Sequence, residues 1–295
     1  MARLASDRVT GVGKMKWQGR RGSDNIEDRR RSGSAGVASG LGIGGMLAVL
    51  AIGYFLGIDV TPLLNGGGQI SAGTGEITAA DEERAEFVSV TLADTEEVWG
   101  KIFREDFGAD YTPATLVLFK GATASPCGGA SGATGPFYCP LDKKVYLDTD
   151  FFVTMNRKLG AKGDFAAAYV VAHEVAHHVQ DELGVLGKAN DVRQRSSQAQ
   201  SNAISVRIEL QADCLSGVWA RHAEASFGSL EPGDIAEAMN AAKQIGDDTL
   251  QRNAGQRPMP DSFTHGTSEQ RQRWFAQGFK SGDARSCDTF SATNL

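Results

Sequence analysis

The chain has 295 residues, of which 41% are hydrophobic and 22% are charged, and its formal net charge at pH 7 is −6. This composition is typical of globular proteins, so it excludes a chain that is disordered throughout, and the length suffices for one large domain or two small ones. Charge is unevenly distributed. Residues 1–35 contain nine Lys or Arg against four acidic residues, a net of +5, so the remaining 260 residues carry −11.

The basic segment 1–35 is expected to be a disordered cytoplasmic tail. Its basic residues alternate with Gly, Ser and acidic residues, and Trp17 is its only aromatic residue. This pattern argues against a nucleic-acid partner, which calls for a concentrated basic patch. Contact with anionic lipid headgroups explains the same charges.

Segment 36–58 contains no charged residue and is long enough to cross a bilayer, so we expect a transmembrane helix that anchors the chain. A cleaved signal peptide is the alternative, although the basic segment before it is unusually long for one. The positive-inside rule then leaves the N-terminus in the cytoplasm and exports everything after the span. Gly36, Gly40 and Gly44 are spaced for close helix approach, which permits a homodimer, but glycine is also simply tolerated in membrane helices.

Segment 59–80 is rich in Gly, Ser and Thr and is expected to be a flexible linker before a domain at 81–295. Helical spacing extends over 81–107, with Asp81 as the cap, and β-rich runs follow at 114–120 and 144–148. We propose the strand around Tyr146 as a sheet edge that binds an extended peptide, although an ordinary buried strand explains it equally well. Further helices are expected at 151–159, 164–182, 191–227 with a break before Glu209, 234–249 and 269–280. The expected fold class is α+β, mainly helical with a small sheet.

Four cysteines lie after the expected span, and an even number outside the cytoplasm indicates disulfides. Three pairings are possible. Proximity in sequence favours Cys127 with Cys139, and Cys214 with Cys287. A cysteine zinc site is disfavoured because no Cys-x-x-Cys pair is present.

The segment 169–178 contains His-Glu-x-x-His within an apolar run that is typical of a helix, with Asp164 at its start and Gly184 after its end. His173 and His177 are four residues apart, so both imidazoles leave the same helix face and can bind one ion, for which zinc is the natural choice. Glu174 lies beside them as a candidate base for a metal-activated water. The alternative is a helix with two surface histidines and a glutamate.

A catalytic zinc needs a third protein ligand, and Glu209 is the candidate. Glu209 and Asp213 are also four residues apart, so one carboxylate can bind metal while the other orients a ligand; Asp213 suits the second role, beside a histidine. A solvated acidic helix face is the alternative. His265, in a turn before the last helix, is the leading candidate for stabilising an oxyanion, with a capping or surface role as the alternative. His178 and His222 have weaker claims.

The motifs at 173–180 and 209–213 resemble the gluzincin pattern, in which the glutamate of Glu-x-x-Ala-Asp is the third zinc ligand. More narrowly, the chain is similar to a bacterial family of neutral zinc metallopeptidases. The resemblance extends over nearly the whole chain and includes residues 15–30, 138–140, 145–148 and 262–266. It implies a zincin-like fold and one zinc per chain, bound by His173, His177 and Glu209 with Glu174 as the base. It says little about substrates.

The sequence therefore predicts a membrane-anchored zinc peptidase of protein or peptide substrates, located at the bacterial inner membrane with its catalytic domain outside the cytoplasm. Two alternatives stay open. One is an envelope scaffold or binding protein that keeps zinc only for stability. The other is a zinc hydrolase of non-peptide amides or peptidoglycan stems.

Overall fold

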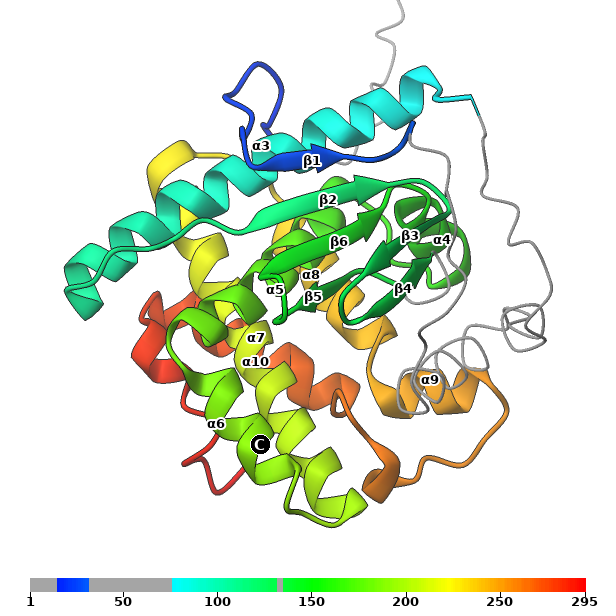
Figure 1. Cartoon of the computed structure of the whole chain (residues 1–295), viewed down its shortest axis with the longest axis vertical. Coiled ribbons are helices and arrows are strands. Elements are labelled where there is room, and N and C mark those ends of the chain that lie inside the picture. Colours follow the sequence, from blue (N-terminus) through cyan, green and yellow to red (C-terminus); the bar gives the residue numbers. More distant parts are fainter. Residues whose placement is uncertain (1–14, 32–75, 132–134) are drawn as a thin grey trace, which may run out of the picture.

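A four-stranded mixed sheet lies at the centre of the fold, in the order β1-β2-β6-β5 (Figure 1). The structure is a computed structural model that describes residues 15–31, 76–131 and 135–295. The first three strands in this order are parallel, and β5 pairs antiparallel with β6. The strands of the main sheet are β1 (Ile26–Asp28), β2 (Thr115–Phe119), β5 (Phe137–Cys139) and β6 (Lys144–Asp148).

The strand order corrects the predicted sheet edge. Tyr146 lies in β6, which is paired with β2 on one side and β5 on the other. Its main chain therefore cannot accept an added strand. Within the described residues the edges of this sheet are β1 and β5. The prediction failed because local sequence shows that a segment is extended but not which strands flank it.

The two faces of the sheet are covered differently. Leu116 and Leu118 of β2 belong to the main core with the helices, whereas Val117 and Phe119 pack in a smaller cluster with Tyr146. This alternation follows from the two-residue period of a strand. An antiparallel hairpin, β3 (Ala122–Ser125) and β4 (Gly128–Ser131), contributes Ala130 to the smaller cluster.

Residues 15–31 belong to the same folded unit as the rest, contrary to the separate tail that the sequence predicted. Strand β1 pairs with β2, and the Trp17 ring, 5% exposed, packs edge-on against Phe87 with 5.5 Å between ring centroids. Arg20 donates hydrogen bonds to the buried carboxylate of Asp94. The basic residues of this segment thus find acidic partners on the domain, and β1 lies in the same compartment as the sheet.

The first long helix, α3 (Ala79–Ile102), begins two residues earlier than predicted and continues into a short π-helical turn, η1 (Phe103–Phe107). Its N-cap is Thr78, not Asp81. The Thr78 hydroxyl accepts from the Asp81 amide, while the Asp81 carboxylate accepts from the Thr78 amide, which makes a capping box.

The chain after β6 is helical, as expected, but its breaks differ from the prediction. The long segment 191–227 is divided at 194–197 rather than before Glu209, and 234–249 contains two helices. Gly163, not Asp164, occupies the N-cap of the motif helix. The elements are α4 (Phe151–Lys158), α5 (Asp164–Glu182), α6 (Val185–Arg193), α7 (Gln198–Phe227), α8 (Asp234–Gln244), α9 (Asp247–Asn253), η2 (Pro260–Ser262), α10 (Ser268–Ser281) and η3 (Ala284–Cys287).

Two glycines allow α7 and α10 to pack closely. A Cβ atom on Gly217 would lie 2.1 Å from the Phe275 carbonyl oxygen, and one on Gly278 would lie 1.8 Å from the Cys214 carbonyl oxygen. Any side chain at either position would force the helices apart. This contact brings residues of α10 against the stretch of α7 that contains Glu209 and Asp213. The fold is thus mainly helical with a small sheet, in the α+β class that was predicted.

Both favoured disulfides are present, Cys127–Cys139 and Cys214–Cys287, with S–S distances of 2.05 Å and 2.01 Å. The expected membrane span at 36–58, its glycines Gly36, Gly40 and Gly44, and most of the expected linker lie outside the described residues. Among the helices of the described part, none is long and apolar enough to cross a membrane.

Candidate metal centre

Helix α5 carries His173, Glu174 and His177 in the interior of the protein. Apolar residues before and between them, from Phe165 to Ala176, are buried, so the helix is covered on most sides. His173 is 6% exposed and Glu174 is 8% exposed. Polar side chains are seldom buried unless they have a partner. The burial of His173 and Glu174 therefore argues against a helix that carries them on its surface.

The two histidines meet Glu209 of α7, which packs beside α5. His173 Nε2 lies 3.1 Å from Glu209 Oε2, and His177 Nε2 lies 3.5 Å from Glu209 Oε1. One ligand atom from each residue lies within 4.8 Å of the other two. The i, i+4 spacing on α5 and the packing of α7 thus bring together the three residues predicted as ligands.

The opposite nitrogen of each imidazole lies near a side-chain oxygen. His173 Nδ1 lies 3.0 Å from Asp213 Oδ1, and His177 Nδ1 lies 2.9 Å from Gln180 Oε1. With hydrogens on the Nδ1 atoms, both Nε2 lone pairs point toward the Glu209 carboxylate. Three lone-pair donors that face one another suit a cation, and two nitrogens with one oxygen suit zinc.

Charge in this cluster is strongly coupled. Burial lowers the pKa of His173, but hydrogen bonds and charge from Asp213 and Glu209 outweigh burial and raise it to about 10. Burial raises the pKa of Glu209, yet the neighbouring histidines hold it well below its usual range. The pKa of Glu174 is raised, mainly by burial. The carboxylates of Glu209 and Asp213 thus favour positive charge at this cluster.

Asp213 is the centre of a buried polar network that the sequence only partly predicted. Arg271 of α10 donates to both of its oxygens, at 2.8 Å from Nε and 3.0 Å from Nη2. The Tyr169 hydroxyl donates to Asp213 Oδ1 at 2.5 Å. Burial would raise the pKa of Asp213, but Arg271 and His173 keep it below its ordinary value. Asp213 is thus held charged beside His173.

His265 lies in the turn before α10 and lines the same cavity as His173, Glu174, His177 and Glu209, a space of about 500 Å³. Its Nδ1 atom is 3.1 Å from Asp247 Oδ1. Asp247 Oδ2 accepts from the backbone amides of Thr264, His265 and Gly266, so one carboxylate shapes the turn and orients the ring. Burial lowers the pKa of His265, but Asp247 and Glu209 raise it overall.

The two remaining histidines have other partners. His178 is 1% exposed; its Nε2 lies 2.7 Å from the Thr112 carbonyl oxygen and its Nδ1 lies 3.2 Å from the Tyr138 hydroxyl. His222 Nε2 lies 2.8 Å from the Gly282 carbonyl oxygen. All three contacts lie outside the metal cluster, and the sequence gave these two residues weaker claims.

A second acidic group, Asp164, Asp234 and Glu237, also has carboxylate oxygens within 4.8 Å of one another. It lies where α5 and α8 begin. Glu237 Oε2 accepts from the Phe165 amide at 3.2 Å, and Asp234 Oδ2 accepts from the Glu231 amide at 2.9 Å. Carboxylates are stabilised at helix N-termini, so these contacts account for the group without a metal.

Sequence reasoning did not find Asp247, Arg271, Tyr169, Gln180 or Gln211. Asp247 and Arg271 lie far from the motifs in sequence and reach the cluster only through tertiary packing. Gln180 offered a local signal, since it lies three residues after His177 and so close to it on the same helix.

The structure therefore presents a candidate mononuclear metal centre within a mainly helical α+β protein. The chain belongs to the family described as "Putative neutral zinc metallopeptidase", which it matches over residues 15–290. This span includes the N-terminal segment with β1 and all of the residues named above.

Relatives cover much of the chain. The uncharacterized protein YpfJ of Escherichia coli (strain K12) is 49% identical over 286 residues, which cover 94% of this chain and 99% of that protein. The uncharacterized protein Rv2575 of Mycobacterium tuberculosis is 47% identical over 195 residues, or 63% of this chain and 65% of that protein. No solved structure matches the chain.

Proposed function

We propose that this protein is a zinc-dependent peptidase with a zincin-like active site. The observation that carries the proposal is the convergence of His173, His177 and Glu209 beside Glu174 at the wall of an open cavity. Family membership supports zinc and peptidase chemistry. The cavity favours an enzyme over a protein that keeps zinc only for stability, because a structural zinc needs no space for a substrate.

In this proposal His173, His177 and Glu209 hold one zinc ion. Zinc bound there would polarise a substrate carbonyl and make water a stronger acid. Glu174 takes a proton from the attacking water as the new C–O bond forms, and delivers it to the amine nitrogen as the C–N bond breaks. Its raised pKa, caused mainly by burial, suits a group that must both accept and release a proton.

His265 is proposed to donate a hydrogen bond to the oxygen that gains negative charge during attack. Asp247 acts as its positioning residue, since its Oδ1 faces Nδ1. Asp247 and Glu209 raise the pKa of His265, which favours the imidazolium form whose Nε2–H can donate. A preorganised donor of this kind is a large contributor to acyl-transfer catalysis.

The substrate is proposed to be an extended peptide that pairs with β5. This strand is an edge of the sheet, and its residues Phe137 and Tyr138 line the cavity that contains the metal cluster. Addition of a strand to an open edge supplies main-chain hydrogen bonds with little demand on side chains. We therefore propose β5, rather than the strand around Tyr146, as the sheet edge that binds the peptide.

We also propose that the protein works in an oxidising compartment outside the cytoplasm, as two disulfides suggest. Because β1 pairs with β2, the residues before and after 36–58 lie in one folded unit and on the same side of any membrane, so a single span with a cytoplasmic N-terminus is not part of this proposal.

The proposal is tested by peptide-library and casein digestion with the full chain, since residues 15–31 are part of the fold. We expect cleavage that a chelator abolishes and added zinc restores. Glu174→Gln should bind zinc as the wild type does and cleave nothing measurable. A wild-type protein with one zinc per chain and no cleavage of any substrate would favour the binding-protein alternative.

A further inference from the structure

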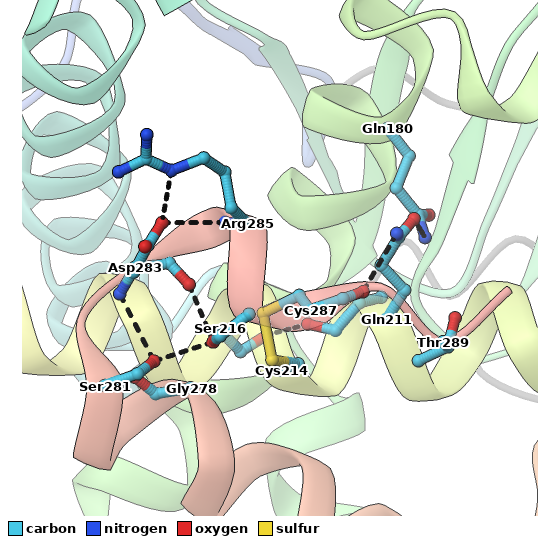
Figure 2. The surroundings of a disulfide bond; sticks show 12 residues. Gln180, Gln211, Cys214, Ser216, Gly278, Ser281, Asp283, Arg285, Cys287 and Thr289 are labelled. Atoms are coloured by element: carbon cyan, nitrogen blue, oxygen red, sulfur yellow. Dashed lines mark hydrogen bonds and ion pairs between the residues drawn. A yellow bond between two sulfur atoms is a disulfide. The ribbon is translucent and has the colours of Figure 1, made fainter. Parts of the chain in front are cut away.

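A chain of hydrogen bonds runs from His177 to the Cys214–Cys287 disulfide. His177 Nδ1 contacts Gln180 Oε1 at 2.9 Å, and Gln180 Nε2 donates to Gln211 Oε1 at 2.9 Å. Gln211 Nε2 then donates to the Cys287 carbonyl oxygen at 3.0 Å. Figure 2 shows Gln180 and Gln211 in succession beside the disulfide. The chain links the motif helix α5, the helix α7 and the C-terminal turn η3.

Two backbone carbonyls fix the direction of this chain. The Cys287 oxygen can only accept, so the amide nitrogen of Gln211 must face it and the Gln211 oxygen must face Gln180. Gln180 Nε2 also donates to the Ile208 carbonyl oxygen at 2.8 Å, which fixes the Gln180 amide in the same sense. The Gln180 oxygen is therefore the atom that faces His177.

This direction sets the hydrogen position on His177. An amide oxygen accepts but cannot donate, so His177 must carry its hydrogen on Nδ1. The Nε2 lone pair is then left toward Glu209. Gln180 is completely buried, so bulk water cannot replace its hydrogen bonds to His177 and Gln211.

The disulfide connects the end of this chain to α7. Cys287 is 1% exposed and completely buried Cys214 directly follows Asp213, the partner of His173. The segment after Cys287 is also held to α7, because the Thr289 hydroxyl donates to the Arg207 carbonyl oxygen at 2.7 Å. Cys214 thus adjoins Asp213, the partner of His173. Cys287 supplies the carbonyl oxygen that ends the chain of hydrogen bonds from His177.

We infer that Gln180 and Gln211 are positioning residues for His177, and that the Cys214–Cys287 disulfide keeps the Cys287 carbonyl in place for them. The disulfide therefore supports metal binding although neither cysteine is a ligand. This inference rests on the proposed function only in taking His177 as a zinc ligand.

The test measures zinc affinity of the full chain by competition with a chromophoric chelator. Gln211→Met removes both hydrogen bonds of Gln211 at similar volume, and we expect zinc affinity to fall about tenfold or more, as for other partners of metal-bound histidines. Long-range ¹H–¹⁵N spectra of the metal-free protein supply a second readout. They should show His177 with its hydrogen on Nδ1 in the wild type and a mixture of tautomers in Gln180→Met.

The paired cysteine variants separate anchoring from general stability. We expect Cys214→Ala with Cys287→Ala to weaken zinc binding, and Cys127→Ala with Cys139→Ala, which removes the other disulfide, to leave it near the wild-type value. If both double cysteine variants lost the same zinc affinity, the Cys214–Cys287 disulfide would have no special anchoring role. Wild-type zinc affinity in Gln211→Met, together with an unchanged tautomer in Gln180→Met, would overturn the positioning role, even if the first cysteine pair failed to fold. Zinc binding without peptide cleavage would contradict the proposed function alone.

Discussion

The Asp213 carboxylate lies between His173 and Arg271, with 3.0 Å from Oδ1 to His173 Nδ1 and 2.8 Å from Oδ2 to Arg271 Nε. Both partners are buried, and so is Asp213. A carboxylate in this position would be costly without compensation, and the guanidinium supplies it. Arg271 thus allows a charged residue to orient His173 deep in the protein.

Removal of the Asp213 charge should weaken metal binding less than removal of Glu209. We expect Asp213→Asn to lower zinc affinity by about 10–100-fold, because it acts through His173. Glu209→Gln should lower it further, because a ligand is lost. The measurement is zinc content after dialysis, with affinity by chelator competition. Metal that survives Glu209→Gln and disappears in Asp213→Asn would reverse the two assignments.

Replacement of His265 should affect turnover rather than metal content. His265→Ala is expected to lower kcat by about 10²–10³-fold, as for the loss of one oxyanion donor, while zinc content stays at the wild-type value. His222→Ala is the matched control, since His222 bonds to the Gly282 carbonyl oxygen and does not line the cavity. A His265→Ala enzyme with unchanged kcat would remove this residue from the proposed mechanism.

The buried Asp81 carboxylate should make stability sensitive to acid. Burial raises its pKa, but Lys120 and Thr78 outweigh burial and hold it far below the ordinary value of 3.8. A depressed folded-state pKa contributes stability that is present above the unfolded pKa and lost as pH falls below it. Asp81→Asn should therefore destabilise the protein by about 1–3 kcal/mol at pH 7 and by less near pH 3.

Urea unfolding between pH 7 and pH 3 checks this prediction. Glu83→Gln removes a charge from the same turn of α3 at an exposed position, so it serves as the control. If both variants lost stability equally at every pH, the capping box would not be the source of the acid sensitivity.

The N-terminal segment should contribute to global stability. Trp17 is almost completely buried against Phe87, so Trp17→Ala is expected to reduce the free energy of unfolding by about 3–5 kcal/mol. Phe290→Ala, at a side chain 37% exposed, should cost much less. Thermal unfolding of the full chain compares the two. If Trp17→Ala melted at the same temperature as the wild type, residues 15–31 would not stabilise the fold, as expected of a separate tail.

Local spacing was enough to predict the centre of the site. His173 and His177 share a face of α5 because they are four residues apart, and the same rule paired Glu209 with Asp213 on α7. Asp247, Arg271 and Gln211 could not be predicted in this way, since their contacts arise only when α9 meets the turn before α10 and when α10 and η3 pack against α7. No periodicity in the sequence encodes those contacts.

The sheet shows the same limit. Strand β6 was predicted at its observed position from its β-rich residues, but its place between β2 and β5 was not. Strand β1 was not predicted because it has only three residues and lies among charges, a pattern typical of a disordered tail. Strand order and the burial of charges depend on the partners that folding supplies, which local sequence does not specify.

The most direct test of the central claim is a zinc titration of the metal-free full chain, with peptide cleavage followed at each addition. We expect activity to rise linearly and to reach a plateau at one zinc per chain. Under the same conditions Glu174→Gln should take up one zinc per chain without any activity. Full occupancy by one zinc with no cleavage by the wild type, or cleavage that persists in Glu174→Gln, would contradict a zinc peptidase with Glu174 as its base.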